Sequence, residues 1–356
     1  MSESTDVKAA LPRAVEGGDV TEETPTRVRS DGARQRVRSS ELLSTFSSKY
    51  ALVGVLVLLW VGFSLVNPAA FATTSNLQTI LSVQATTGLL ALAVVVPLVA
   101  GQFDLSTGFQ LGLAQSLCAV LVIREQWPPL LAILVVLVVG AVIGIINGQL
   151  ITRLGLPSFT TTLGVGMVVL GLTEWLTSNQ VITGPAAKWF FNLGRQRLAG
   201  VPLPFLYLAV VAVLLFILLE LTVWGRRSYA VGANPTAARL SGIDADRQVR
   251  QSLLITGLLC ALAGCISMMS LGGSSPVIGL GSLLPAFAAA FLGATCIRPG
   301  RYNVAGTVIA VYVIGVGITG LQQLGADSFA QDLFNGAALL IALIISTIAR
   351  RRRVVA

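Results

Sequence analysis

Long apolar runs separated by short polar connections determine what this chain can fold into. Ten such runs lie at roughly 50 to 66, 77 to 100, 105 to 123, 130 to 150, 158 to 177, 203 to 222, 251 to 271, 282 to 297, 303 to 324 and 330 to 349. Most are close to the roughly 20 residues that a helix needs to cross a bilayer core. Only 11% of the 356 residues are charged, against about 25% in soluble domains. The pattern predicts an all-α, polytopic membrane helix bundle with about ten transmembrane helices.

Basic residues predict how this bundle is oriented. With the N-terminus inside, 20 of the 24 Lys and Arg residues fall in internal segments, and the other four are Arg124, Lys188, Arg195 and Arg197. Because cytoplasmic loops carry the excess of Lys and Arg, both termini are predicted to be cytoplasmic. The connection 101–104 has no Lys or Arg, so residues 77–123 could form two spans or a re-entrant hairpin.

The two ends of the chain differ from the predicted transmembrane domain, 50–349. Residues 1–49 hold eight basic and eight acidic residues, which predicts a disordered cytoplasmic tail. The first apolar run begins only near Tyr50, so no cleaved signal peptide is predicted. Residues 350–356 are predicted to form a basic cytoplasmic tail.

Within the spans, four free cysteines are expected to act as small buried hydrophobes: Cys118, Cys260, Cys265 and Cys296. Dense glycines predict close helix packing, at 164, 166, 171, 306, 315, 317 and 320.

The residues of common enzymatic sites are missing from the sequence. There is no His, and none of Lys8, Lys49 and Lys188 lies in a GxxxxGK[ST] loop. The chain is therefore predicted to be no enzyme and to bind no ATP through a P-loop. Any work that it performs must come from another subunit.

The polar segment 226–243, between two apolar runs, is the candidate element for receiving that work. Its sequence GANPTAARLSGI (232–243) predicts a turn at Asn234–Pro235, a short helix from Thr236 to Leu240 and a stop at Gly242. A passive cytoplasmic loop is the alternative.

Three further motifs occur with GANPTAARLSGI: GQFDLSTG (101–108), NGQLITRLGLPSFTTTLG (147–164) and FLGATCIRPGRYNVAGTVIA (291–310). In this combination the chain resembles, from about residue 50 to its end, the permease subunits of ribose-type ABC sugar importers in the branched-chain amino-acid/sugar permease superfamily. The family's GGTSLxGGxG run reads GATCIRPGRY here.

That resemblance implies a permease domain that moves a monosaccharide or similar polyol inward across the inner membrane of a bacterium. It also implies several partners: a second permease copy or homologue, a cytoplasmic ATPase subunit, an extracytoplasmic solute-binding protein and the lipid bilayer. ATP and Mg²⁺ would be used by the ATPase, with no cofactor in this chain and no nucleic acid partner.

The resemblance further implies that 226–243 holds a coupling helix, seated in a cleft of the ATPase. Ala237 and Ala238 would allow close approach, Arg239 would pair with an acidic rim and Gly242 would end the helix. The predicted coupling residues are Tyr229, Gly232, Asn234, Pro235, Ala237, Ala238, Arg239 and Gly242.

Polar side chains in or beside the spans are candidates for the substrate pathway. Asp104 precedes an apolar helix, with Ser106 two residues on, which favours an N-cap; hydrogen bonding to sugar hydroxyls is the second interpretation. Each uncharged candidate suits an interhelical hydrogen bond equally well. The set comprises Gln84, Asp104, Ser106, Asn147, Thr160 and Thr161, with Thr162 beside them.

The external segment 178–202 is predicted to hold a helix that lies at the interface between the membrane and water on its external side, because aromatic residues at 189–191 adjoin cations. The resemblance implies that Lys188, Arg195 and Arg197 dock acidic patches of the binding protein, and simple anchoring at the interface is the alternative. Two rival functions stay open: a branched-chain amino-acid-type permease, and an ion-coupled secondary transporter that depends on Asp104.

Overall fold

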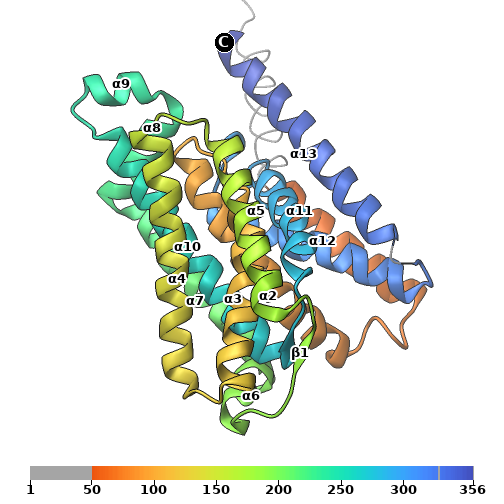
Figure 1. The fold of residues 1–356 in the computed structure, drawn as a ribbon. Coiled ribbons are helices and arrows are strands. Elements are labelled where there is room, and N and C mark those ends of the chain that lie inside the picture. Colours follow the sequence, from red (N-terminus) through yellow and green to blue (C-terminus); the bar gives the residue numbers. More distant parts are fainter. Residues whose placement is uncertain (1–49, 328, 356) are drawn as a thin grey trace, which may run out of the picture. The chain divides into compact units, whose positions relative to one another are not determined.

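A computed structural model describes residues 50–327 and 329–355, which are predominantly helical (Figure 1). Among these residues, seven helices are long and apolar enough to cross a membrane: α2 (Thr74–Val99), α3 with its π-helical end η1 (Ser106–Ala119, Val120–Arg124), α4 (Pro129–Arg153), α5 (Ser158–Thr177), α7 with η2 (Leu203–Phe216, Ile217–Leu221), α10 (Ala245–Leu271) and α12 (Val304–Gln323). Three shorter apolar helices in the same part of the chain are Tyr50–Val66, α11 (Ile278–Gly293) and Phe329–Ile341 within α13 (Phe329–Val355). The chain is therefore a multi-pass helical membrane protein, as predicted.

Each of the ten predicted spans overlaps one of these helices, although the count of ten crossings and the side of each terminus stay predictions. The span predicted at 282–297 is displaced, since α11 already ends at Gly293 and residues 294–303 form turns around Gly300, whose φ is +82°. The helix α13 continues to Val355, so most of the predicted tail 350–356 is helical. The predicted tail 1–49 lies outside the described residues.

Short elements distinguish the two ends of the helix bundle (Figure 1). The helices α8 (Val223–Ala233) and α9 (Pro235–Leu240) lie at one end, called the α9 end below, together with the C-terminal end of α13. The helix α6 (Lys188–Arg195) and strand β1 (Ile182–Thr183) lie at the opposite end, the α6 end. The basic segment after α7 and the end of α13 thus share one end, in agreement with the predicted charge distribution.

Two minimal antiparallel ladders occur in the connections between the described helices, and the sequence pattern did not predict them. β1 (Ile182–Thr183) pairs with β4 (Gly273–Ser274), and β2 (Arg197–Leu198) pairs with β3 (Val201–Pro202). Ile182 lies opposite Ser274. Each strand has only two residues, so the fold class remains all-α.

The turn at 101–104 lies at the α9 end, because a Cβ at Gly101 would lie 3.1 Å from the Cα of Gly232 in α8. The backbone N–H of Phe103 donates to Ser158 Oγ at 3.3 Å. The other ends of the two helices lie at the α6 end: Gln78 Nε2 donates to the carbonyl of Gly200 at 2.8 Å, and an Arg124 guanidinium N–H donates to that of Thr177 at 3.3 Å. Residues 77–123 therefore form two helices that each run between the ends, which favours two spans over a re-entrant hairpin; the membrane crossing of each stays a prediction.

The helix α2 lies at the centre of the bundle because its C-terminal half is apolar on every side. All residues from Gly88 to Val99 are buried, as expected of a helix without a polar face. It packs against α7, α10, α11 and α12. Almost all of α3 with η1 is also buried, so these two helices form the core that the other spans surround.

Glycines bring several helices into backbone contact. On α4, Gly140 and Gly144 are four residues apart and meet α10; a Cβ at Gly257 of α10 would lie 2.1 Å from the Gly140 carbonyl oxygen. This small-xxx-small pattern was not singled out in the sequence. Packing is confirmed at the predicted glycines 166, 306, 315, 317 and 320, whereas a Cβ at Gly164 or Gly171 would meet nothing within 4 Å.

Candidate functional site

The segment 222–246 forms a helical projection at the α9 end. Asn234 has an extended backbone that ends α8, and its Oδ1 accepts a hydrogen bond from the Ala237 N–H at 3.0 Å to begin α9. Pro235 occupies the first turn of α9, where its missing N–H costs no hydrogen bond. The turn predicted at Asn234–Pro235 is therefore confirmed.

The end of α9 also has the predicted geometry. Gly242 has a φ of +79°, and the Ile243 N–H donates to the Ala238 carbonyl at 3.0 Å. A left-handed glycine with such a bond is the usual C-terminal stop of a helix. Two residues later, Asp244 Oδ1 accepts from the Arg247 N–H at 2.8 Å and begins α10. Both ends of α9 are thus fixed by local bonds, which holds the short helix rigid.

The two faces of α9 differ in what they contact. Ala238 is buried against Val231 and Val249 of its own chain, so only Ala237 of the predicted alanine pair is open to a partner. Leu240 is 86% exposed, and sequence reasoning missed it. The signal was present, because Leu240 lies two positions after the buried Ala238 and therefore faces away from the chain.

Arg239 has a partner within the chain. Its guanidinium lies 2.6 Å from Asp246 Oδ1, and both side chains are about half exposed (59% and 44%). The pairing of Arg239 with an acidic rim of a partner, which the resemblance implied, stays a prediction. An exposed pair of this kind contributes at most about 1 kcal/mol to folding, so Arg239 remains able to exchange Asp246 for another carboxylate.

Two predicted coupling residues face the body of the chain. A Cβ at Gly232 would lie 2.1 Å from the Val99 carbonyl oxygen, so only glycine permits this contact between α8 and the end of α2. The Tyr229 hydroxyl lies 2.7 Å from the Tyr302 carbonyl and 3.1 Å from Glu220 Oε1. Burial, and then the Glu220 carboxylate, raise the pKa of Tyr229, so its hydroxyl remains a hydrogen-bond donor.

Three of the predicted pathway residues meet in one buried cluster at the start of α3. Asp104 Oδ1 accepts from the Ser106 N–H at 3.0 Å and from its hydroxyl at 2.5 Å. Ser106 Oγ accepts from Asn147 Nδ2 at 2.8 Å and from Gln110 Nε2 at 2.7 Å. Asp104 therefore caps a free N–H of α3, as predicted, although the helix begins geometrically after Leu105. Gln110 was missed because it lies inside an apolar run.

The cluster is closed to the outside in this structure. Asp104, Ser106, Gln110 and Asn147 are each at most 2% exposed. The remaining side-chain oxygens of Asp104, Gln110 and Asn147 have no hydrogen-bond partner among the described residues. Buried polar oxygens without a partner are costly, so this site would accept a donor if it opened.

The other predicted pathway residues lie elsewhere. Gln84 packs on α12, where a Cβ at Gly315 would lie 2.4 Å from its Cγ. Thr160 is exposed at the start of α5, and the Thr160 and Thr161 hydroxyls both donate to the Pro157 carbonyl, at 3.2 and 2.7 Å. Thr162 Oγ accepts from the Leu105 N–H at 3.0 Å and so fixes the α2–α3 turn. The pathway set is therefore divided between three places.

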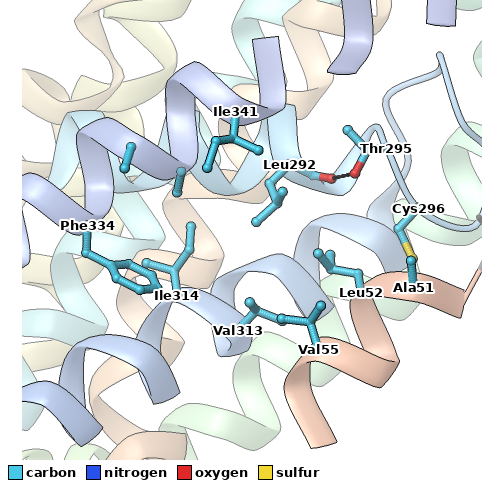
Figure 2. A pocket seen from close by; sticks show the side chains of 12 residues that line it. Ala51, Leu52, Val55, Leu292, Thr295, Cys296, Val313, Ile314, Phe334 and Ile341 are labelled. Atoms are coloured by element: carbon cyan, nitrogen blue, oxygen red, sulfur yellow. Dashed lines mark hydrogen bonds between the residues drawn. The ribbon is translucent and has the colours of Figure 1, made fainter. Parts of the chain in front are cut away.

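Two of the cavities among the described residues differ in the chemistry of their lining. An apolar pocket of about 350 Å³ lies between the helix Tyr50–Val66, the end of α11, α12 and α13, and its lining side chains are drawn in Figure 2. Its Thr295 hydroxyl already donates to the Leu292 carbonyl at 2.7 Å (Figure 2), so the pocket offers little to a sugar. A second cavity, of about 240 Å³, lies beneath α9 and is lined by Gln102, Ser158, Arg239 and Asp246 among others.

At the α6 end, the three predicted docking cations differ in their contacts within the chain. Arg195 Nε and an Arg195 terminal N–H donate to the carbonyls of Ser270 and Leu271, both at 3.1 Å, so Arg195 caps the end of α10. Lys188 and Arg197 are exposed. The predicted helix is present as α6, and Phe190 anchors it because that side chain is fully buried.

Comparisons with known proteins agree with this architecture. A family model described as "Branched-chain amino acid transport system / permease component" matches residues 76–343. The ribose import permease protein RbsC of Bacillus subtilis is 35% identical over 320 residues, 90% of this chain and 95% of the relative. The fructose import permease protein FrcC of Rhizobium meliloti is 30% identical, covering 92% of this chain and 93% of the relative.

The D-allose transport system permease protein AlsC of Escherichia coli is 29% identical, covering 89% of this chain and 96% of the relative. No solved structure matches the chain. The match of the family model over most of the chain, together with this multi-pass helical fold, shows that the chain belongs to the branched-chain amino acid transport system permease family.

Proposed function

We propose that this chain is the membrane-spanning subunit of an ATP-binding-cassette importer that moves a monosaccharide inward across a bacterial cytoplasmic membrane. The names of its relatives, which include ribose, fructose and D-allose permeases, support the substrate class. The excess of basic residues at the α9 end supports a cytoplasmic position for that end. ATP would then be hydrolysed by a separate subunit.

The observation that carries the proposal is the exposed face of α9. A two-turn helix that projects from a membrane bundle, with a rigid start at Asn234 and a rigid stop at Gly242, buries little within its own chain. Leu240, with 86% of its surface exposed, is suited to a hydrophobic pocket of an ATPase, and Arg239 is suited to a carboxylate at the rim of that pocket.

We infer that the sugar route runs along a contact between two permease copies. The buried cluster at Asp104 is closed within one chain, whereas Thr160 lies on the exposed side of α5. Gly164 and Gly171 lie on the same helix and have open space at their Cβ positions. A second copy would cover this face, and Lys188 and Arg197 at the α6 end would receive the solute-binding protein.

The proposal can be tested by purifying the tagged chain from its native membrane and quantifying the ATPase that remains bound. Burial of a leucine contributes about 1.5–3 kcal/mol, so Leu240→Glu is expected to weaken ATPase retention about 10- to 100-fold. Leu198→Glu is a matched control, because Leu198 is 64% exposed at the α6 end. It should leave retention unchanged.

The outcomes separate the rival functions. A P-loop ATPase and a sugar-loaded binding protein in the wild-type preparation would support the proposal, and a bound branched-chain amino acid would support the amino-acid permease. Recovery of the chain alone, or equal retention in the Leu240 and Leu198 variants, would contradict the coupling role of α9.

A further inference from the structure

A cluster of polar side chains joins α8 to a loop about 70 residues later in the chain. Glu220 comes from η2, Tyr229 from α8, and Arg298 and Arg301 from the turns that connect α11 to α12. Arg298 forms an ion pair with Glu220 Oε2, and the Arg301 guanidinium carbon lies 4.0 Å from the centroid of the Tyr229 ring. With the Tyr229 bond to the Tyr302 carbonyl, these contacts form what is called the α8 joint below.

The two partners of the ion pair in the α8 joint differ in burial. The Glu220 side chain is 7% exposed and that of Arg298 is 48% exposed. A buried carboxylate that loses its cation is strongly unfavourable, so Glu220 holds Arg298 in place. The Tyr229 hydroxyl has one hydrogen to share between Glu220 and the Tyr302 carbonyl. A small displacement of α8 therefore changes which of them it bonds.

The same face of α8 contacts a second loop. Gly232 is three residues after Tyr229, so both lie on one side of the helix. Gly232 meets the backbone at Val99 and Gly101, where α2 ends. α8 is thus a short rigid element that leads into α9. It contacts the α2–α3 turn through Gly232 and the α11–α12 loop through Tyr229.

Aromatic rings connect the two loops to each other. The Tyr302 ring packs edge-on against Phe291 of α11 at 5.8 Å between centroids, and Phe291 lies 6.4 Å from Phe103 of the α2–α3 turn. Such ring pairs have preferred packing geometries. Movement of the Tyr302 backbone would therefore displace both α11 and the α2–α3 turn, which carries Asp104.

We propose that the α8 joint transmits displacement of α9 into the α11–α12 loop, with Glu220, Tyr229 and Arg298 as positioning residues. The proposal rests on the proposed function, since it requires an ATPase that moves α9. These residues touch neither ATP nor sugar. Their loss should separate ATP hydrolysis from sugar uptake while the complex still assembles.

The test is a reconstituted complex with Tyr229→Phe, which keeps the ring over Arg301 and removes only the hydroxyl. Three quantities are measured: bound ATPase, the ATP hydrolysis rate and sugar taken up per ATP hydrolysed. The expected result is normal ATPase binding, a melting temperature within a few degrees of wild type and at least a fivefold fall in uptake per ATP. Tyr207→Phe is the matched control, because the Tyr207 hydroxyl donates to the Leu193 carbonyl of α6 at 3.0 Å, at the opposite end of the bundle from α8. It should leave uptake per ATP unchanged.

A second comparison uses the ion pair. Glu220→Arg and Arg298→Glu should each uncouple the complex, and the two substitutions together should restore at least half of the uptake per ATP. Restoration would not be expected from general damage to the fold. Unchanged uptake per ATP in Tyr229→Phe, or an equal fall in the Tyr229 and Tyr207 variants, would overturn the proposal. Loss of ATPase binding from the wild-type chain would instead overturn the proposed function.

Discussion

Gly257→Ala should destabilise the bundle because the added methyl group has no space. The new Cβ would lie 2.1 Å from the Gly140 carbonyl oxygen and 3.2 Å from the Gly144 nitrogen. Both contacts are backbone atoms, so no side chain can rotate away. Because non-bonded heavy atoms need about 3.5 Å, α4 and α10 would have to separate by roughly 1 Å.

The size of the effect follows from two opposing contributions. Overpacking of a close contact costs about 1–3 kcal/mol, while alanine is favoured over glycine in a helix by about 1 kcal/mol. The clash should prevail, because α4 and α10 form an extensive contact that must shift as a whole. Taking the upper part of the overpacking range, about 2–3 kcal/mol, we expect a net loss of roughly 1–2 kcal/mol, which lowers the melting temperature by about 2–6 °C.

The assay is thermal unfolding of purified protein in detergent, with Gly281→Ala as the control. Gly281 also lies within a helix, α11, but its Cβ would meet nothing within 4 Å, so the control should melt at or slightly above the wild-type temperature. If both variants melted at the same temperature, the close approach of α4 and α10 would not be the reason for glycine at this position.

Three further outcomes can be checked in the same preparation. Asn303→Ala should lower stability by about 1–2 kcal/mol, measured by thermal unfolding, because buried Asn303 caps the Gly306 N–H at 2.7 Å and donates to the Gly293 carbonyl; wild-type stability would refute the capping role. Arg239→Gln should shift stability by less than about 1 kcal/mol, because its ion pair is exposed, and a larger loss would show that the pair stabilises the fold. Maleimide labelling should be at least 100-fold slower in native than in unfolded protein at the fully buried thiols of Cys118, Cys260 and Cys265. Rapid labelling of the native protein would contradict their burial.

Local patterns in the sequence predicted the helices well. Apolar runs of near-spanning length became helices because backbone hydrogen bonds must be satisfied within each segment in a bilayer. The stop at Gly242 and the turn at Asn234 were also predictable, since capping depends on a few adjacent residues. Charge counting grouped the basic segment near α8 with the C-terminal end, and both lie at the α9 end (Figure 1).

Contacts between distant segments were not predictable in the same way. Hydropathy does not specify which side of a span faces a neighbour, so the sequence left Gln84 between the pathway and an interhelical contact, and it did not predict packing on Gly315. Nor did it predict that Arg195 donates to the free carbonyls at the end of α10. The pathway role of Gln84 and the docking role of Arg195 stay predictions. The α8 joint was missed because Tyr229 and Arg298 meet only after the bundle assembles.

The most direct test of the central claim is uptake of labelled ribose, fructose and allose by proteoliposomes that contain this chain, its co-purified ATPase and its binding protein. Subunits oriented with the α9 end inside should take up a sugar only when ATP is enclosed, and Leu240→Glu should abolish that uptake without lowering the amount of chain in the vesicles. Uptake by the chain alone, driven by an ion gradient and indifferent to ATP, would contradict the account.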